Sequence, residues 1–158
     1  MRNIRIMYQY DGSKYYGFQR QKNKDTVQGD IEKIVFSKFN EKINMTSSGR
    51  TDRGVHALGQ VSNFSISKRI PLDAIKQQIN KTLRGKVKIL SIEEIHADFN
   101  ARFDAKRRTY LYVLKNESKI TPFEAPYVTS IKEEIDIDKL QLIFQPLTGV
   151  HDFSSFAK

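Results

Sequence analysis

The stretch RNIRIMYQYDG, residues 2–12, alternates apolar or aromatic side chains with more polar ones. The first set consists of Ile4, Ile6, Tyr8 and Tyr10, and the second of Arg5, Met7 and Gln9. A period of two is typical of a strand with one buried face, and the turn-forming pair Asp11-Gly12 ends the pattern. The sequence therefore predicts a first strand that belongs to a one-sided sheet.

A helix and two strands are predicted next. Thr26 can cap a helix over 26–39, although Gly29 occupies the position where a capping box has Glu. Its apolar residues follow a spacing of three and four: Val27, Ile31, Ile34, Val35 and Phe39. A short strand near 43–48 and another near 58–66 follow, separated by a polar stretch.

A second helix and a fourth strand complete the pattern up to residue 96. Pro71 suits the first turn of a helix, and Val87 begins another apolar run. One face of that helix carries Leu72, Ile75, Ile79 and Leu83. The order β-α-β-β-α-β predicts an α+β class, ferredoxin-like fold, with an antiparallel sheet and both helices on one face.

The remaining residues predict a strand over 107–115, a turn at TPFEAP and a helix that starts at Asp136 or Asp138. The helix would bear Leu140, Ile143, Phe144 and Leu147. Phe153 and Phe156 then follow with no later element to cover them.

We therefore expect a domain over residues 1–116, a connecting segment over 117–158 that starts a second subdomain, and a missing second half. Without that half, Phe153 and Phe156 would be exposed, disordered or buried against another copy of the chain.

The polar stretch SGRTDRGVHA, residues 48–57, is a loop between two predicted strands. Asp52 is the only acidic residue within 42–72, and Arg50 and Arg53 lie on either side of it. Neighbouring cations favour an ionised carboxylate, which suits a nucleophile better than a general acid. The alternative is an aspartate that only bonds loop amides in a tight turn.

The charge of the 158-residue chain is uneven. Residues 1–116 hold 23 Lys and Arg against 11 Asp and Glu, net +12, whereas residues 117–158 hold 4 against 7, net −3. Such a basic region favours a polyanionic partner, chiefly nucleic acid, although a solvated lysine-rich surface gives the same count. The chain has no cysteine, which excludes thiolate metal sites and cysteine nucleophiles within it.

Aromatic and basic residues are interleaved in two places. Tyr15, Tyr16 and Phe18 lie among Lys14, Arg20, Lys22 and Lys24, and Tyr110 and Tyr112 follow Lys106, Arg107 and Arg108. This mixture suits base stacking combined with phosphate contact, although strand aromatics also build cores. The histidines His56, His96 and His151 lack metal-ligand spacing. With no apolar run long enough to span a membrane, we expect a soluble, cytoplasmic protein without a membrane partner.

Four stretches resemble one known family. GRTDRGVHALGQVSNF, residues 49–64, resembles the signature of the TruA family of tRNA pseudouridine synthases, which runs close to GRTDxGVHAxGQVxxF. YDGSKYYGFQRQ at 10–21, followed by TVQ at 26–28, resembles its N-terminal motif, with Phe18 where a tryptophan is common. FNARFDAKRRTYLYVL at 99–114 is similar to its third block, and GVHDFSSFAK at 149–158 to the loop that opens its second half.

The resemblance implies an isomerase that converts uridines in the anticodon stem-loop of tRNA to pseudouridine, without cofactor or metal and as a homodimer. Asp52 matches the catalytic aspartate, as a nucleophile or as a base. Arg50 would fill the gap left by the flipped base, and Tyr110 would stack on its uracil. The expected RNA-binding residues are Arg20, Lys22, Arg53, His56, Arg102, Arg107 and Arg108.

The chain departs from the family in lacking the later motifs, which supply a basic partner for the aspartate and the apolar pocket wall. It is therefore expected to be the N-terminal half and inactive alone. The alternative is a non-catalytic RNA-binding module with a ferredoxin-like fold. YYGF at 15–18 only loosely resembles the aromatic motif of such modules and precedes the first helix.

Overall fold

The structure is a computed structural model that describes residues 1–156. The chain divides into two compact units, residues 1–110 and 111–158. The first unit contains, in chain order, β1 (Arg2–Tyr10), α1 (Val27–Phe39), β2 (Thr46–Ser47), β3 (Ala57–Ile66), α2 (Leu72–Thr82) and β4 (Val87–Ile95). The predicted β-α-β-β-α-β order is therefore confirmed.

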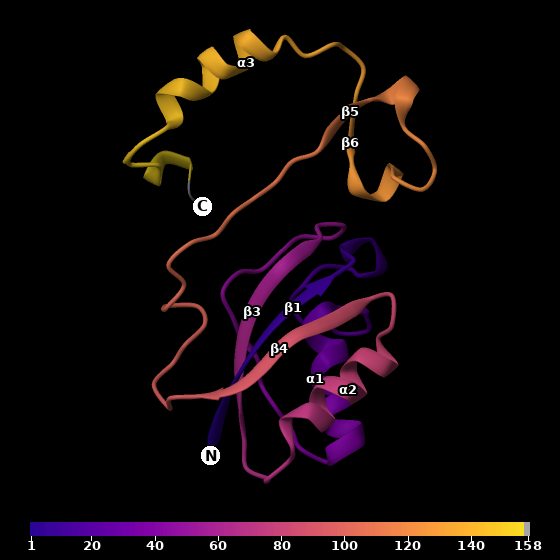
Figure 1. Cartoon of the computed structure of the whole chain (residues 1–158), viewed down its shortest axis with the longest axis vertical. Coiled ribbons are helices and arrows are strands. Elements are labelled where there is room, and N and C mark those ends of the chain that lie inside the picture. The colour runs from indigo at the N-terminus through magenta and orange to yellow at the C-terminus, as the bar shows by residue number, and fades with distance from the viewer. Residues whose placement is uncertain (157–158) are drawn as a thin grey trace. The chain divides into compact units, whose positions relative to one another are not determined.

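The strands of the first unit form one sheet in the order β2-β3-β1-β4, and every neighbouring pair is antiparallel. Helices α1 and α2 lie on the same face of that sheet (Figure 1). Apolar residues of the sheet and both helices meet between these layers, with Ile4, Ile6, Ile31, Ile75 and Ile79 fully buried. The predicted ferredoxin-like architecture is confirmed.

Local sequence accounts for the helix ends. The Thr26 side chain accepts a hydrogen bond from the backbone N–H of Gly29 at 3.2 Å, so the cap forms without the glutamate of a capping box. Asn40 ends α1 in the left-handed region, at φ 51°. Pro71 precedes the first residue of α2, as expected for a residue that cannot donate a backbone hydrogen bond.

Two asparagines of the sheet, the buried Asn3 and the half-buried Asn63, hold the segment after β4 against it. Asn3 donates to the carbonyl oxygens of His96 and Phe99, at 3.1 and 2.9 Å. Asn63 accepts from the backbone N–H of Ala101 at 2.9 Å. The segment that begins the third family-like block is thereby tied to β1 and β3.

The second unit contains β5 (Leu114–Asn116), β6 (Thr129–Ile131) and α3 (Ile137–Phe144). The two strands pair in parallel. Asp136 accepts from the N–H of Lys139 at 3.0 Å, which confirms the predicted helix start. The α-helix ends at Phe144, and Leu147 lies in a following 3-10 turn that contains Pro146.

The prediction of a strand over 107–115 is wrong for most of its length. Only 114–116 is a strand, and residues 105–113 form neither helix nor strand. Alternation fits a segment for a sheet, but a strand also needs a neighbour for its N–H and C=O groups. Among the described residues, β6 supplies such a partner only from Leu114 onward.

The final aromatic residues are exposed. Phe153 has 47% of its surface exposed, and Phe156 has 85%. Exposure is one of the three states expected for them. The last two residues of the GVHDFSSFAK motif, 157 and 158, lie outside the described residues.

Candidate active site in the Asp52 loop

Residues 49–56, here called the Asp52 loop, connect β2 to β3. Asp52 is exposed, as are Arg50 and Arg53 on either side of it. This confirms the expectation that Asp52 lies in the loop after the second strand rather than in a helix. The carboxylate can reach a bound molecule directly from the surface.

The entrance to the loop is held by β3. The Ser48 hydroxyl donates to the side-chain oxygen of Gln60 at 2.9 Å, and the Gln60 amide donates to the carbonyl of Gly49 at 2.6 Å. The backbone N–H of Ser48 also donates to Val61 at 2.9 Å. Because Gln60 is buried, its side of both bonds is shielded from water.

The residue before Asp52 is held at two points. The carbonyl of Thr51 accepts from the N–H of Phe18 at 3.0 Å, and its hydroxyl lies 2.8 Å from the hydroxyl of Tyr10. After Asp52, its own carbonyl accepts from the N–H of Val55 at 3.3 Å. The backbone on both sides of the carboxylate is therefore anchored.

Two glycines lie where the N-terminal motif packs against the loop, Gly12 because of the close approach and Gly17 because of its positive φ. A Cβ atom on Gly12 would lie 2.0 Å from the carbonyl oxygen of Val55, so no side chain fits there. Gly17 adopts φ +110°, and a Cβ on it would lie 3.5 Å from the Thr51 oxygen and 3.6 Å from the Arg53 nitrogen. The N-terminal motif and the motif that contains the Asp52 loop are thus packed against each other.

His56 closes the loop onto that motif. Its Nδ1 accepts from the N–H of Gly12 at 3.1 Å and lies 3.2 Å from an Asp11 carboxylate oxygen. The same Asp11 oxygen accepts from the backbone and hydroxyl of Ser13, at 3.0 and 2.6 Å. This geometry gives His56 a role in fixing the loop, and the expected RNA contact stays a prediction.

The interleaved aromatics separate into core and surface. Tyr15 and Phe18 are each only 2% exposed, whereas Tyr16 is 45% exposed. Burial, together with nearby Asp30, raises the pKa of the Tyr15 hydroxyl, so it stays protonated. The Tyr16 ring has the Lys24 ammonium 4.3 Å from its centre and the Arg53 guanidinium 4.6 Å from it. The predicted mixture of aromatic and basic groups therefore reaches the surface at Tyr16.

Arg20 forms an ion pair with Glu32 at 2.8 Å. Glu32 is buried and also accepts from the side chain of Gln28 and the backbone N–H of Met45, at 2.9 and 3.0 Å. The Arg20 side chain is still 59% exposed. It therefore compensates a buried charge while keeping part of its surface in solvent.

The third block contributes an anchor that the sequence did not indicate. The Arg108 guanidinium donates to the carbonyls of Ser48 at 2.7 Å and Arg102 at 3.1 Å. It thus ties residues 102–108 to the loop entrance. The Arg102 guanidinium lies 5.5 Å from the centre of the Phe103 ring.

Three further residues of the predicted site lie at the surface of the first unit. They are Lys22, Arg107 and Tyr110, the last of which is 69% exposed.

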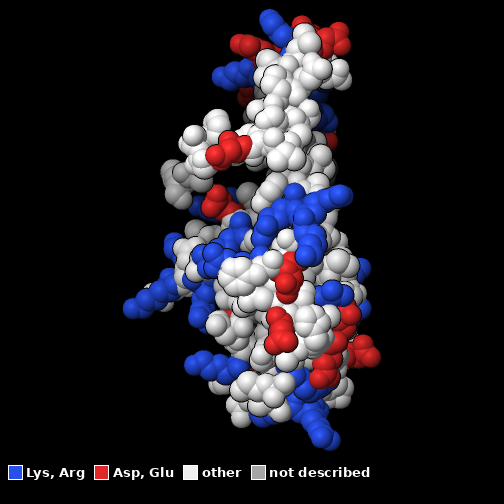
Figure 2. All heavy atoms as spheres, turned by 90° about the vertical axis from the view of Figure 1, so that its left-hand side faces the viewer, with Lys and Arg blue, Asp and Glu red and all other residues white. Residues whose placement is uncertain are grey.

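Basic residues dominate the first unit, with 22 Lys and Arg against 11 Asp and Glu in residues 1–110. Figure 2 shows the side of this unit turned away from α1 and α2, where Lys and Arg gather and acidic side chains are fewer. Within residues 1–156, no cluster of three or more His, Cys, Asp or Glu side chains could hold a metal ion. No helix of this part of the chain is long and apolar enough to cross a membrane.

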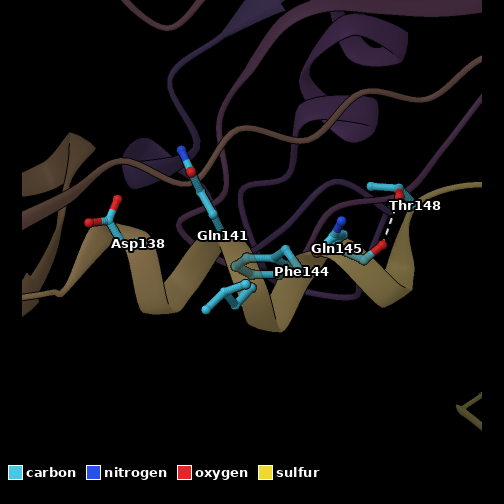
Figure 3. A pocket seen from close by; sticks show the side chains of 6 residues that line it. Asp138, Gln141, Phe144, Gln145 and Thr148 are labelled. Atoms are coloured by element: carbon cyan, nitrogen blue, oxygen red, sulfur yellow. Dashed lines mark hydrogen bonds between the residues drawn. The ribbon is translucent and has the colours of Figure 1, made fainter.

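The second unit has an open hollow along α3 (Figure 3). It is lined by Asp138, Gln141, Leu142, Phe144, Gln145 and Thr148. The Thr148 hydroxyl donates to the carbonyl of Gln145 at 2.7 Å. Asp138 is the only charged residue of the six, so the hollow offers no pair of groups for acid–base chemistry.

These features define an α+β protein of the ferredoxin-like class, with an exposed carboxylate on an anchored loop in a basic unit. The family model described as tRNA pseudouridine synthase matches residues 6–104, which include the whole Asp52 loop. The chain belongs to this family.

Curated relatives match nearly the whole chain. They include tRNA pseudouridine synthase A of Borrelia turicatae, 40% identical over 157 residues, and that of Dictyoglomus thermophilum, 41% identical over 158. The protein named tRNA pseudouridine synthase A 2 of Bacillus cereus is 35% identical over 158 residues. Each comparison covers 99% of this chain but only 64% of the relative, so the chain spans about two-thirds of its relatives' length.

Proposed function

We propose that this chain forms the Asp52-bearing part of an enzyme that isomerises uridines in the anticodon stem-loop of tRNA to pseudouridine. The observation that carries the proposal is the exposed Asp52 carboxylate, flanked in the sequence by two arginines on a loop anchored at Ser48, Thr51 and His56. A carboxylate on an anchored backbone can be presented to a flipped nucleotide with little reorganisation of the loop.

In the proposed reaction, the bond between uracil N1 and ribose C1′ breaks, the base turns over, and C5 forms the new bond to C1′. The C5 proton leaves and N1 gains a proton, so the reaction is an isomerisation with no other reactant. Asp52 acts either by adding to the ribose or the base, or by removing a ribose proton. Its exposed position is compatible with each of these roles.

Arg50 would occupy the space that the flipped base leaves, and Tyr110 would stack on the uracil. The surface formed by Tyr16, Lys24 and Arg53 suits contact with RNA phosphate and bases beside the loop. The remaining basic residues proposed to contact RNA are Arg20, Lys22, Arg102, Arg107 and Arg108, together with His56. For Arg20 and Arg108, such contact would use the part of each guanidinium that its protein partners leave open.

The proposal extends to the organisation of the protein. Residues 1–116 form the catalytic subdomain, and 117–158 connect it to a second one. The enzyme works in the cytoplasm as a homodimer, without cofactor or metal. A non-catalytic RNA-binding module is the competing function, and it has no need for a carboxylate between two arginines, because that charge repels phosphate.

The test is the replacement Asp52→Asn in a chain completed to the length of its relatives. Release of tritium from tRNA labelled at uracil C5 should fall by at least about 1000-fold. Binding of tRNA should be unchanged or slightly stronger, because the substitution removes a negative charge. Asp98→Asn, which alters another exposed carboxylate of the first unit, serves as the matched control and should keep full turnover.

If the wild-type chain bound tRNA without releasing tritium, the binding-module function would replace the proposed one. If Asp52→Asn turned over like Asp98→Asn, the reaction would not depend on this carboxylate.

A further inference from the structure

Tyr10, the last residue of β1, lies beneath the Asp52 loop. Its side chain is buried, with only 4% of the residue exposed. Its ring centre lies 6.1 Å from that of Phe18, and its hydroxyl lies 2.8 Å from that of Thr51. Phe18 also donates its backbone N–H to the Thr51 carbonyl. Thr51 is therefore held through its side chain by Tyr10 and through its backbone by Phe18, whose ring lies near that of Tyr10.

Holding Thr51 constrains Asp52 directly. The Thr51 carbonyl and the Asp52 nitrogen belong to one planar peptide unit, so fixing the carbonyl fixes where the Asp52 backbone begins. The Asp52 carbonyl is bound by Val55 on the other side. The side-chain torsions are then the main freedom left to the carboxylate. A displacement of about 1 Å at such a group is enough to lower a reaction rate strongly.

We propose that Tyr10 is a positioning residue, whose hydroxyl bond to Thr51 orients the Asp52 backbone for catalysis. The inference rests on the proposed function for its catalytic part, and on the geometry of residues 10, 18 and 51 for its structural part. Burial raises the pKa of the Tyr10 hydroxyl more than the bond to Thr51 lowers it. The hydroxyl therefore keeps its proton at neutral pH, and the bond persists there.

Tyr8 provides a matched control within the same strand. It lies two residues earlier on the same buried face, and its ring centre is 6.1 Å from that of Tyr10. Its hydroxyl lies 2.8 Å from that of Ser62 on β3, which in turn lies 2.6 Å from that of Ser47. Tyr8→Phe therefore removes the same atom from the same core, but from a bond outside the Asp52 loop.

The first readout is amide hydrogen exchange in this chain, which needs no activity. The probes are the N–H groups of Phe18 and Val55, because they donate to Thr51 and Asp52. Tyr10→Phe should speed their exchange about fivefold, as expected for loss of one neutral hydrogen bond. Tyr8→Phe should change it less than twofold. Thr51→Val should match Tyr10→Phe, and the double variant should exchange no faster than either one.

The second readout is steady-state kinetics in the completed chain. Tyr10→Phe should lower kcat about tenfold and change KM less than twofold, because a buried hydroxyl makes no contact with RNA. Tyr8→Phe should alter neither constant by more than twofold. If the loss of a buried hydroxyl only reduced the amount of folded enzyme, the apparent kcat would fall equally in both variants.

Equal exchange in the Tyr10→Phe and Tyr8→Phe variants would overturn the structural part of the inference. Faster exchange with unchanged kcat would overturn its catalytic part. An inactive wild-type chain would instead refute the proposed function, and the exchange comparison alone would then decide whether Tyr10 orients the loop.

Discussion

Replacing Gly12 by alanine should destabilise the first unit and loosen the Asp52 loop. The new Cβ would lie 2.0 Å from the carbonyl oxygen of Val55, 2.4 Å from its carbonyl carbon and 2.9 Å from its nitrogen. All three are backbone atoms, so no side-chain rotation can relieve the contact. The N-terminal motif and the loop must therefore move apart.

The expected loss of stability is the sum of two contributions, one from the steric contact and one from a broken hydrogen bond. Overpacking of this kind costs about 1–3 kcal/mol. Separation also breaks the bond from the Gly12 N–H to His56, which is worth about 1 kcal/mol. We expect a loss of about 2–4 kcal/mol, and hence a fall in Tm of at least about 8 °C for a unit of this size.

The measurement is urea unfolding followed by circular dichroism, since the chain contains no tryptophan. Gly49→Ala is the matched control, because a Cβ there would meet nothing within 4 Å. It should be neutral or stabilising by about 0.4–1 kcal/mol, through lower entropy of the unfolded chain. The reasoning is refuted if the two variants have free energies of unfolding within about 0.5 kcal/mol of each other.

Two further predictions concern pH and salt. The Glu41 carboxylate accepts from the N–H of Ser67 at 2.6 Å and from its hydroxyl at 2.9 Å, and these bonds lower its pKa below the ordinary value of 4.5. Its contribution to stability should be complete above pH 4.5 and disappear as the pH falls further, so Glu41→Gln should unfold with a weaker dependence on acid; identical acid profiles would contradict this. Affinity of this chain for tRNA should fall steeply as salt rises, given the excess of 22 Lys and Arg over 11 Asp and Glu in residues 1–110. Titrations in increasing salt that leave affinity constant would favour a merely solvated basic surface.

Part of the site could be predicted from sequence because its signals are local. The combination of one carboxylate, two arginines and two glycines in residues 49–54 predicts a polar loop between two strands, and the structure places Asp52 in that loop. How the loop is held could not be read in the same way. Tyr10 looks like any other residue on the buried face of a strand, and its bond to Thr51 spans 41 positions of the chain.

Which of two neighbouring tyrosines is exposed also depends on the tertiary structure. Tyr15 and Tyr16 are adjacent and chemically identical, yet one is buried and the other is 45% exposed. In the sequence, Arg108 is one of several basic residues with nothing to distinguish it. The fold brings its guanidinium to the carbonyl of Ser48, 60 positions away. No periodicity within a short window reports such contacts.

The sequence alone determined the order of the helices and strands up to residue 96, since side-chain period, the Thr26 cap and the proline at 71 act over a few residues. It also limited the start of α3 to Asp136 or Asp138, and the structure shows that Asp136 is the cap. Only the tertiary structure decided that residues 107–113 are not a strand, because pairing requires a partner whose position is set by the whole fold. It likewise decided the anchoring of Asp52, because hydrogen bonds between distant residues depend on the packing of the sheet and not on the chain nearby.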